Sequence, residues 1–459
     1  MNVAPILTLE ELSKAVSDNT IDTVLVVFPD LQGRPVGKRV VGSFFIDHVA
    51  HHGIEACDYL LAVDVDMEPV PGYSFTNWET GYGDLIARCD LSTLRIISWL
   101  PKTALVICDV FTKDLEPIDV APRTMLKNQL ARAAYRGFEV KTGTELEFFL
   151  FKNSFDQARD SAYKNLVAHS GGIEDYQIFE TSREEFIIRE IRNEMLKASI
   201  PVEFSKGEAG HGQHEINITY AEALRCADNH MIFKNGVREI IALSGLSATF
   251  MAKWSMDEVG SSCHIHSSLW QTIDGKEVSV MPDDSGNYGL SKIARQWIAG
   301  QLHGATELAW CYAHYVNSYR RYVPGSWAPT AIAWGIDNRT CGFRVVGSGQ
   351  GRRVENRIPG ADVNPYIALS AVIASGLYGI DNNLDLEEPL MGNGYVASDV
   401  KRIPNTLPDA IVAFETSEIA NEAFGNQVHS HYLNTARQEW LSYNKVVTDW
   451  ELRRNFERI

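Results

Sequence analysis

The stretch GTELEFFLF at residues 143–151 constrains the fold of this chain more than any other. Glu145 and Glu147 alternate there with large apolar residues, and this period of two predicts a strand with both carboxylates on one face. Two like charges this close are unfavourable in a half-buried strand unless a cation lies between them, and oxygen ligands suit a divalent metal. A solvated strand face would show the same alternation, so this stretch alone leaves both interpretations open.

Three further stretches repeat the spacing of two with apolar residues in between. They are SSCHIHSSL with His264 and His266, GQHEINI with Glu215 and Asn217, and RRVENRI with Arg353, Glu355 and Arg357. Four strands of one sheet that turn their polar faces toward a common cavity would explain all four patterns. Cys263 falls on the opposite strand face from His264, so we expect it in the core.

Bulk properties narrow the class of protein. A chain of 459 residues is too long for one small core and predicts two domains of unequal size. Its net charge of −17 argues against a surface that binds nucleic acid. Seven cysteines without a CxxC pair fit reduced thiols in the cytoplasm. We expect neither a signal peptide nor a membrane span, because there is no basic leader and no window approaches eighteen uninterrupted apolar residues.

Local patterns predict an α+β chain. Thr8 and Glu11 have the spacing of a capping box, which predicts a helix to about residue 18. Strands are expected at 23–29, up to 41, 59–66, 104–111, 138–142 and 145–151, and helices at 123–137, 183–198, 220–245, 290–315, 365–382 and near the C-terminus. The long aromatic loop 67–84 has the length of a functional loop, and the polar stretch 152–180 is a candidate mobile lid.

Six motifs together resemble the metal, glutamate and ATP motifs of the glutamine synthetase family. They are, in order, GTELEFFLF, GEAGHGQHEIN (207–217), GSSCHIHSSL (260–269), NSYRRYVPGSWAPT (317–330), DNRTCGFR (337–344) and RRVENRIPGADVNPY (352–366). The resemblance covers nearly the whole chain. It implies a glutamine synthetase-like α+β fold, with an N-terminal β-grasp domain at 1–115 and a catalytic domain with a curved antiparallel sheet at 116–459. It also implies a homo-oligomer, a dodecamer of two hexameric rings, in which a neighbour's loop closes each active site.

The resemblance implies two sites for Mg²⁺ or Mn²⁺. Glu147, Glu208 and Glu215 would hold the metal nearest the amino-acid substrate. Glu145, His264 and Glu355 would hold the metal that clamps the nucleotide phosphates. Five carboxylates and one histidine form a hard, oxygen-rich donor set that suits these ions better than a structural zinc. His211 and His214 have no matched ligand role, and we expect them to be structural.

Arginines supply the positive half of the expected site, because a planar and permanently charged fork matches carboxylates and phosphates. By resemblance, Arg321 and Arg357 contact glutamate and the acyl phosphate, and Gly260 lets the backbone approach this substrate closely. Also by resemblance, the phosphates and the nucleotide are bound by Arg339, Arg344, Arg353, His266 and Ser268. Arg321, Arg339 and Arg344 are the expected catalytic residues. The alternative is that several of these arginines are surface charges or salt-bridge partners of the acids. Neither a P-loop nor a Rossmann motif occurs in the sequence, so metals and arginines are expected to hold ATP.

The family implies an ATP-dependent carboxylate–amine ligase that works in two steps. ATP phosphorylates the γ-carboxylate of L-glutamate, and an amine then displaces phosphate. Ammonia-using members carry an acidic residue two positions after the glycine of the VPG motif, where this chain has Trp327. An ammonium ion needs a dense set of oxygen acceptors, which tryptophan lacks. The GYGD loop and the C-terminal VTDWELRRNFERI are similar to the branch that joins glutamate to larger amines.

The expected amine is apolar or aromatic, such as aniline, in a pocket formed by Trp327, Val63 and Tyr176. A γ-glutamylpolyamine or γ-glutamylalkylamide synthetase is the alternative, because loop acids could bind a cationic amine if they point inward. These acids are Asp64, Asp66, Glu68 and Glu79. A non-catalytic, nitrogen-sensing ring protein is disfavoured, since it would keep clustered carboxylates without a metal. A guanidino kinase is disfavoured by the VPG motif and the N-terminal segment.

Overall fold

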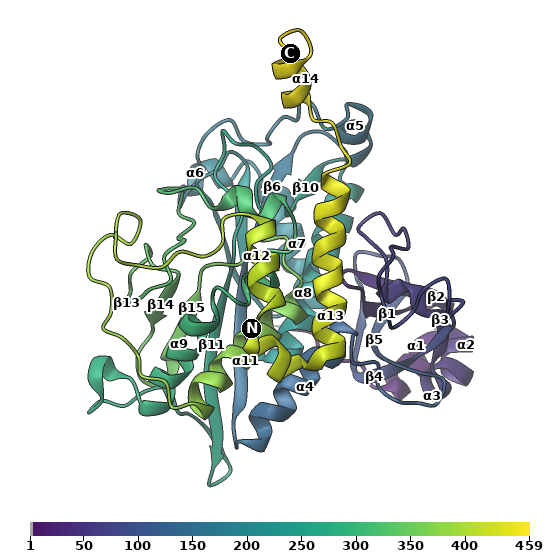
Figure 1. The fold of residues 1–459 in the computed structure, drawn as a ribbon. Helices are drawn as coiled ribbons and strands as arrows, with labels where there is room; N and C mark the ends of the chain where they lie inside the picture. Colours follow the sequence, from purple (N-terminus) through teal and green to yellow (C-terminus); the bar gives the residue numbers. More distant parts are fainter. Residues whose placement is uncertain (1–2) are drawn as a thin grey trace.

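The computed structural model describes residues 3–459, and two sheets organise this part of the chain. A five-stranded sheet lies in the N-terminal part and a ten-stranded sheet in the remainder (Figure 1). The first ends with β5 (Thr103–Phe111), and the second begins with β6 (Glu139–Phe151), with helix α4 (Pro122–Tyr135) between them. This arrangement agrees with a domain boundary near residue 115, which stays a prediction.

The N-terminal sheet has the strand order β2-β1-β5-β4-β3, and its central pair β1 and β5 is parallel. Its other strands are β1 (Thr23–Pro29), β2 (Pro35–Val41), β3 (Ile54–Cys57) and β4 (Asp84–Ile96), and its helices are α1 (Leu9–Ser17), α2 (Gly42–Phe44), η1 (Phe45–Val49), α3 (Ala50–His52) and η2 (Asp58–Leu61). The predicted capping box is confirmed, because the Glu11 N–H donates to the Thr8 hydroxyl at 3.1 Å and the Thr8 N–H donates to the Glu11 carboxylate at 2.8 Å.

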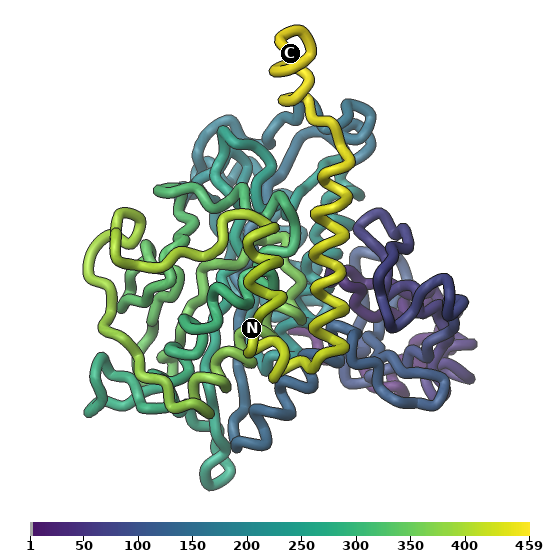
Figure 2. Tube along the Cα trace, viewed as in Figure 1, coloured from purple at the N-terminus to yellow at the C-terminus, as the bar shows by residue number. Residues whose placement is uncertain are grey.

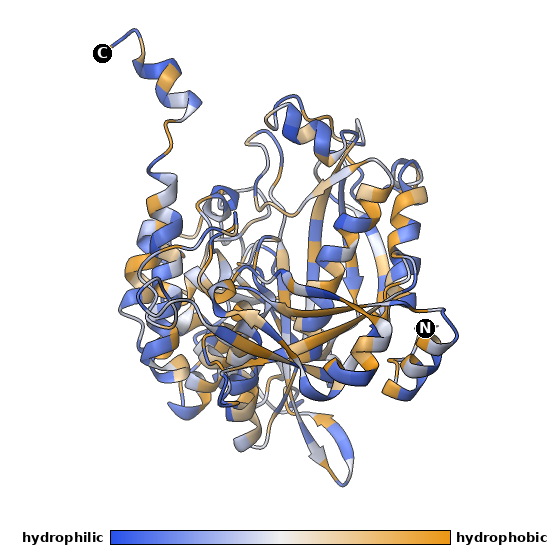
Figure 3. Ribbon diagram, turned by 90° about the vertical axis from the view of Figure 1, so that its right-hand side faces the viewer, coloured by the Kyte–Doolittle hydropathy of each residue, from blue (hydrophilic) through white to orange (hydrophobic). Residues whose placement is uncertain are grey.

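The large sheet has the strand order β13-β14-β15-β11-β6-β8-β7. Its strands after β6 are β7 (Val202–Gly207), β8 (Gln213–Ile218), β9 (Ala221–Glu222), β10 (Ser247–Thr249), β11 (Cys263–Ile273), β12 (Lys276–Ser279), β13 (Trp334–Ile336), β14 (Phe343–Val346) and β15 (Arg353–Asn356). All pairs along this order are antiparallel except β13 with β14, and the sheet is curved (Figure 3). The four strands with the spacing of two, β15, β11, β6 and β8, are adjacent, which confirms the prediction from their alternation.

Helices cover the apolar face of this sheet. Helices α4 and α8 (Ala223–Leu243) pack against β6, whose apolar side chains Leu146, Phe148 and Leu150 are fully buried. The remaining helices are α5 (Phe155–Asp160), α6 (Ile178–Thr181), α7 (Glu185–Lys197), η3 (Asn287–Gly289), α9 (Lys292–Gly304), α10 (Ala309–Tyr312), η4 (Asn317–Arg321), η5 (Gly349–Gly351), α11 (Pro365–Asp381), α12 (Leu407–Glu415), α13 (Glu418–Tyr443) and α14 (Asp449–Asn455). Because α8 and α4 occupy one face of β6, the glutamates of β6 point to the other face.

Helix α11 is the centre of the helical layer. It packs against α4, α8 and α9, and nearly all of its side chains are buried. Pro365 stands at its first turn, and the side chain of Asn364 caps it by accepting the Tyr366 N–H at 3.0 Å. A helix that is apolar on all sides is expected at such an interior position.

Two C-terminal elements reach beyond this layer. Helix α13 contacts the N-terminal part, where Tyr73 and Thr435 share a hydrogen bond at 3.0 Å. Helix α14 protrudes from the body at the end of the tube (Figure 2). Its exposed apolar side chains and those of the segment before it are Val446, Val447, Trp450, Leu452 and Phe456. None of the helices within residues 3–459 has the length and apolar character that crossing a membrane requires.

Several element predictions were wrong. The expected strand 59–66 is the short helix η2 followed by a turn, in which the Asp64 carboxylate accepts the N–H groups of Asp66 and Glu68 at 2.9 and 3.0 Å. This local bonding competes with strand pairing. The expected helix 290–315 is divided into α9 and α10, the two expected strands at 138–151 are one strand, and β4 was missed.

Candidate active site

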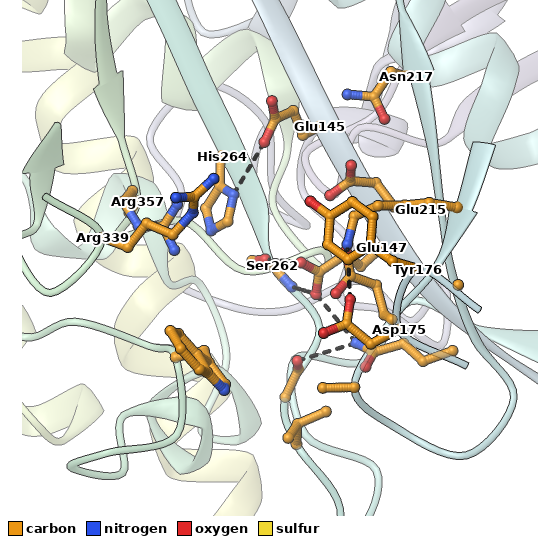
Figure 4. Close-up of a pocket in the computed structure, with 18 of the residues that line it drawn as sticks. Glu145, Glu147, Asp175, Tyr176, Glu215, Asn217, Ser262, His264, Arg339 and Arg357 are labelled. Atoms are coloured by element: carbon orange, nitrogen blue, oxygen red, sulfur yellow. Dashed lines mark hydrogen bonds and ion pairs between the residues drawn. The ribbon is translucent and has the colours of Figure 1, made fainter. Parts of the chain in front are cut away.

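The polar face of the large sheet opens into a cavity of about 830 Å³. All six residues that the sequence predicts as metal ligands line it: Glu145, Glu147, Glu208, Glu215, His264 and Glu355. Figure 4 shows several of them approaching from neighbouring strands, with Arg339 and Arg357 facing the acids across the cavity. The alternative of a solvated strand face is therefore wrong for Glu145 and Glu147.

One carboxylate group of this cavity consists of Glu147, Glu208 and Glu215. One oxygen from each lies within 4.8 Å of the others. Glu147 and Glu215 are directly opposite each other in the β6–β8 ladder, and Glu208 directly follows β7. Glu147 is held in place by Ser262, whose N–H donates to it at 2.8 Å and whose hydroxyl also donates.

Burial and neighbouring carboxylates raise the pKa of Glu147 and of Glu215. Burial, together with the charges of Glu145, Glu147 and Glu208, raises the pKa of Glu215 to about 10. Burial and the charge of Glu208 raise the pKa of Glu147 to about 7. Like charges crowd here without a sufficient counter-charge, so a divalent cation with oxygen ligands fits this group.

A second group surrounds Glu145 and Glu355. His264 Nδ1 lies 3.2 Å from a Glu145 oxygen and 3.5 Å from a Glu355 oxygen. His266 Nε2 lies 2.9 Å from the other oxygen of Glu145, so this histidine joins the group. Glu145, His266 and Glu355 offer ligand atoms within 4.8 Å of one another. The sequence had indicated a place for His266 on the nucleotide side only.

Opposing effects set the charges in this second group. Burial alone would raise the pKa of Glu355, but His264 and Arg357 outweigh it and lower that pKa to about 2. Burial would likewise raise the pKa of Glu145, yet the hydrogen bonds from His264 and His266 hold it well below its usual range. Burial and Arg357 lower the pKa of His264 to about 4, so its ring is neutral and able to bind a metal ion near neutral pH.

Arginines form the positive side of the cavity. Arg321, Arg339, Arg344 and Arg357 line it. Arg344 Nη1 and Arg357 Nη1 donate to the two oxygens of Glu355 at 2.9 and 2.5 Å. The alternative of salt-bridge partners therefore applies to these two, although both also face the cavity.

The remaining arginines and the residues predicted to bind the nucleotide do not all line the cavity. Arg321 is buried, and its Nη1 donates to the Ile358 carbonyl at 2.9 Å. Arg353 does not line the cavity, and its Nε donates to His266 Nδ1 at 3.1 Å. Ser268 also lies outside the lining and accepts the Trp270 indole N–H at 2.9 Å. Arg353 is linked to the cavity through His266, which contacts Glu145.

Gly260 is needed where the chain passes Arg321. A Cβ atom at this position would lie 2.6 Å from Arg321 Cγ and 2.7 Å from the Ala252 carbonyl oxygen. Neither distance is tolerated, so only glycine fits between these groups. This restriction comes from the protein's own groups, and the predicted close approach of the Gly260 backbone to the substrate stays a prediction.

Some of the residues that line the cavity are aromatic and carry no carboxylate. Trp327 and Tyr176 line the cavity as predicted, and both have a positive φ, of 60° and 56°. Val63 does not line it, because its side chain is fully buried in the N-terminal part. Its role in amine binding stays a prediction.

Sequence patterns missed Asp175 and Lys206, which also line the cavity. Lys206 precedes Glu208 by two positions, and the same alternation that exposed the other site residues could have placed both on one strand face. Asp175 stands in an irregular segment with no such periodicity.

Residues 173–176 are held against the large sheet by a buried cluster of Glu174, Glu184 and His214. Glu174 and Glu184 are fully buried beside His214, whose Nε2 lies 2.7 Å from Glu184 and 3.4 Å from Glu174. Bridges also join Ile173 to His211 and Asp175 to Gly207. The expected mobile lid is therefore anchored at the end that bears Tyr176.

Comparisons with known proteins identify the family of this chain. The model of the glutamine synthetase catalytic domain matches residues 119–455. Gamma-glutamylethanolamide synthetase GlnA4 of Streptomyces coelicolor is 47% identical over 455 residues, which cover 99% of this chain and 97% of that protein. Glutamate–isopropylamine ligase of a Pseudomonas species is 36% identical over 449 residues, which cover 97% of each chain.

Solved structures show the same fold. Ligand-free GmaS superposes with a TM-score of 0.84 at 28% identity, covering 97% of this chain and 99% of that chain. A GmaS complex with ADP gives a TM-score of 0.83 at 30% identity with the same coverage. The chain therefore belongs to the glutamine synthetase family, in its branch of glutamate–amine ligases.

Proposed function

We propose that this enzyme joins the γ-carboxylate of L-glutamate to a small primary amine, with ATP as the phosphoryl donor and γ-glutamyl phosphate as the intermediate. One observation supports this most strongly: two acid-rich groups and four arginines line a single cavity of about 830 Å³. Such a cavity can hold a nucleoside triphosphate and the glutamate substrate side by side. Catalysis of phosphoryl transfer consists mostly of positioning and charge neutralisation, which these groups provide.

The oxygen-rich donor sets suit Mg²⁺ or Mn²⁺. Glu147, Glu208 and Glu215 would hold one ion, and Glu145, His264 and Glu355 would hold the other, with His266 beside them. When bound, these ions neutralise phosphate charge and orient the phosphoryl group.

The protein's own residues have distinct tasks in this reaction. Arg339 and Arg344 line the cavity, and we assign them to the nucleotide phosphates, where they would stabilise charge that develops on the transferred phosphoryl group. Arg357, held against Glu355, would bind the glutamate or acyl-phosphate oxygens. Arg321 donates a hydrogen bond to the Ile358 carbonyl and lies against Gly260. In this fixed position it would orient the substrate. His266 and Arg353, joined by a hydrogen bond, would support the nucleotide side together with Ser268.

For the amine, the proposal is a primary amine whose substituent carries no charge. Trp327 lines the cavity where ammonia-using members carry an acid, and an indole offers no acceptor for ammonium. The two relatives act on ethanolamine and isopropylamine by name, which favours a short alkylamine. An arylamine such as aniline fits the same apolar wall and is the second candidate.

We also propose a cytoplasmic homo-oligomer, a dodecamer of two hexameric rings. Support comes from exposed apolar groups in two places. Trp78 of the loop 67–84 is 76% exposed, and Trp450 and Phe456 of the C-terminal segment are 60% and 81% exposed. Apolar side chains gathered at such positions are typical of interfaces.

The proposal is tested by ADP release in the presence of glutamate, ATP and Mg²⁺ with one amine at a time. The amines are isopropylamine, ethanolamine, aniline, putrescine and ammonium. We expect the highest kcat/KM for isopropylamine or ethanolamine and the lowest for ammonium. The proposed amine class is wrong if ammonium or putrescine is preferred, and a nitrogen-sensing role is supported if no amine stimulates ADP release.

A further inference from the structure

A lysine is held among the acids of the cavity. Lys206 Nζ lies 2.5 Å from a Glu208 oxygen and 3.5 Å from a carboxylate oxygen of Asp175. The ring of Tyr176 lies against it, with 4.3 Å between Nζ and the ring centroid. Only 18% of its side chain is exposed, so this ammonium group is fixed in place.

Each carboxylate that lines the cavity belongs to a candidate metal group or faces Lys206. Six carboxylates line it, namely Glu145, Glu147, Asp175, Glu208, Glu215 and Glu355. Five of them belong to the two candidate metal groups. The sixth, Asp175, faces Lys206. Among the described residues that line the cavity, no carboxylate is left to receive a second cation.

Apolar side chains line the same cavity as Lys206. Tyr176, Ile178, Phe204 and Trp327 line the cavity and expose 71%, 81%, 50% and 60% of their surface. An alkyl or hydroxyalkyl substituent can pack against these side chains. An ammonium group there would lose its hydration without gaining a carboxylate, and it would be repelled by Lys206.

We propose that Lys206 determines amine specificity, by pairing with Asp175, the acid that would otherwise hold the distal ammonium of a diamine. The enzyme then accepts amines with an uncharged substituent and rejects diamines and polyamines. This inference rests on the proposed function, because it concerns the amine that attacks the γ-glutamyl phosphate. In that step the amine nitrogen forms a bond to the carbonyl carbon of the γ-carboxyl group, the bond from this carbon to the phosphate oxygen breaks, phosphate leaves, and the nitrogen loses a proton.

The test compares n-butylamine with putrescine, which has the same length and one additional amino group. Lys206→Met keeps the length of the side chain and removes its charge. We expect the ratio of kcat/KM for putrescine to that for n-butylamine to rise by at least about tenfold in this variant, because Asp175 is released. Lys206→Arg keeps the charge and should leave the ratio unchanged.

A double variant identifies the released acid. Adding Asp175→Asn to Lys206→Met should return the ratio toward that of the wild type, since the distal ammonium loses its partner. An unchanged ratio in Lys206→Met, with n-butylamine still a substrate, overturns the inference.

Lys206→Gln serves as a second neutral variant. If it and Lys206→Met are folded but inactive with every amine, Lys206 is needed for the reaction itself and the specificity role is wrong. Failure of the proposed function looks different, because the wild type would then ligate none of these amines.

Discussion

Glu147 on β6 is bound by Ser262, which donates both its backbone N–H, at 2.8 Å, and its hydroxyl to the carboxylate. Gln213 adds a third donor at 3.1 Å. These donors orient the carboxylate toward Glu208 and Glu215 although burial and the charge of Glu208 raise its pKa to about 7. A fold that builds such a contact against electrostatic repulsion keeps the carboxylate for function.

Removing this carboxylate tests the assignment. We expect Glu147→Ala to lower kcat by more than about 100-fold while the protein stays folded, because a metal ligand is lost but repulsion is relieved. Steady-state kinetics at saturating Mg²⁺ and circular dichroism measure the two effects. Turnover near the wild-type level at high Mg²⁺ would show that the metal group has been misassigned.

The crowding of carboxylates around Glu215 predicts that a bound metal ion stabilises the folded wild type more than a variant without this carboxylate. In EDTA near neutral pH, Glu215→Gln should raise Tm, because the raised pKa of Glu215 means that the wild type must take up a proton there on folding, whereas glutamine is neutral in both states. Adding Mg²⁺ or Mn²⁺ at about 100 times its Kd should stabilise the wild type by about 2.7 kcal/mol and the variant much less. Glu203, exposed on β7, provides the control Glu203→Gln. Equal metal responses in all three proteins would contradict the proposed ligand set.

Arg344 joins Asp337 to Glu355. Its Nη1 donates to Glu355 at 2.9 Å, and its Nε donates to Asp337 at 3.0 Å. We expect Arg344→Gln to lower kcat by roughly 100- to 1,000-fold, as for other groups that stabilise transition-state charge. Asp337→Asn is the matched control, because Asp337 is 69% exposed and its loss should have little effect. Similar losses in both variants would mean that Arg344 serves only to hold its ion pairs.

The raised pKa of Glu174 predicts that the stability of the protein depends on pH. Burial and then the neighbouring Glu184 raise its pKa from 4.5 to about 8. Because this carboxyl is protonated more readily in the folded state, its stabilising contribution is complete below about pH 4.5 and is lost as the pH rises through 8. Glu174→Gln imitates the protonated form, so its Tm should exceed that of the wild type increasingly between about pH 5 and pH 8.

The control for this comparison is Glu190→Gln, on the exposed side of α7. Its Tm should follow the wild type at every pH. Parallel melting curves for Glu174→Gln and the wild type across this range would show that Glu174 is ionised in the folded protein.

The proposed oligomer can be tested through shared active sites. Trp78 lies at an exposed part of the loop 67–84, and its ring contacts Tyr82 with 5.0 Å between centroids. We expect Trp78→Ala to lower activity without lowering Tm. Mixed oligomers of Trp78→Ala and Glu147→Ala chains should regain activity, because some sites then combine an intact loop with intact metal ligands. No recovery in mixed oligomers of verified composition, or a fully active monomer in sedimentation experiments, would contradict the shared site.

The alternation of residues along β6, β8, β11 and β15 was readable because a strand places every second side chain on one face. It predicted the inward-facing acids and histidines, and the order of six motifs indicated the family. The capping box at Thr8 was equally local. The strand pattern failed at 59–66, where the Asp64 carboxylate accepts N–H groups of its own turn and this local bonding replaces strand pairing.

The sequence by itself determined the donor set of the site, since the residue types and their spacing set which groups share a strand face. Only the tertiary structure decided how these groups combine. His266 joined Glu145 because β11 and β6 pair in one register, and Lys206 met Asp175 because an irregular segment anchored by Glu174 returns to β7. Contacts between residues so far apart in the chain depend on its path and packing, which no local pattern encodes.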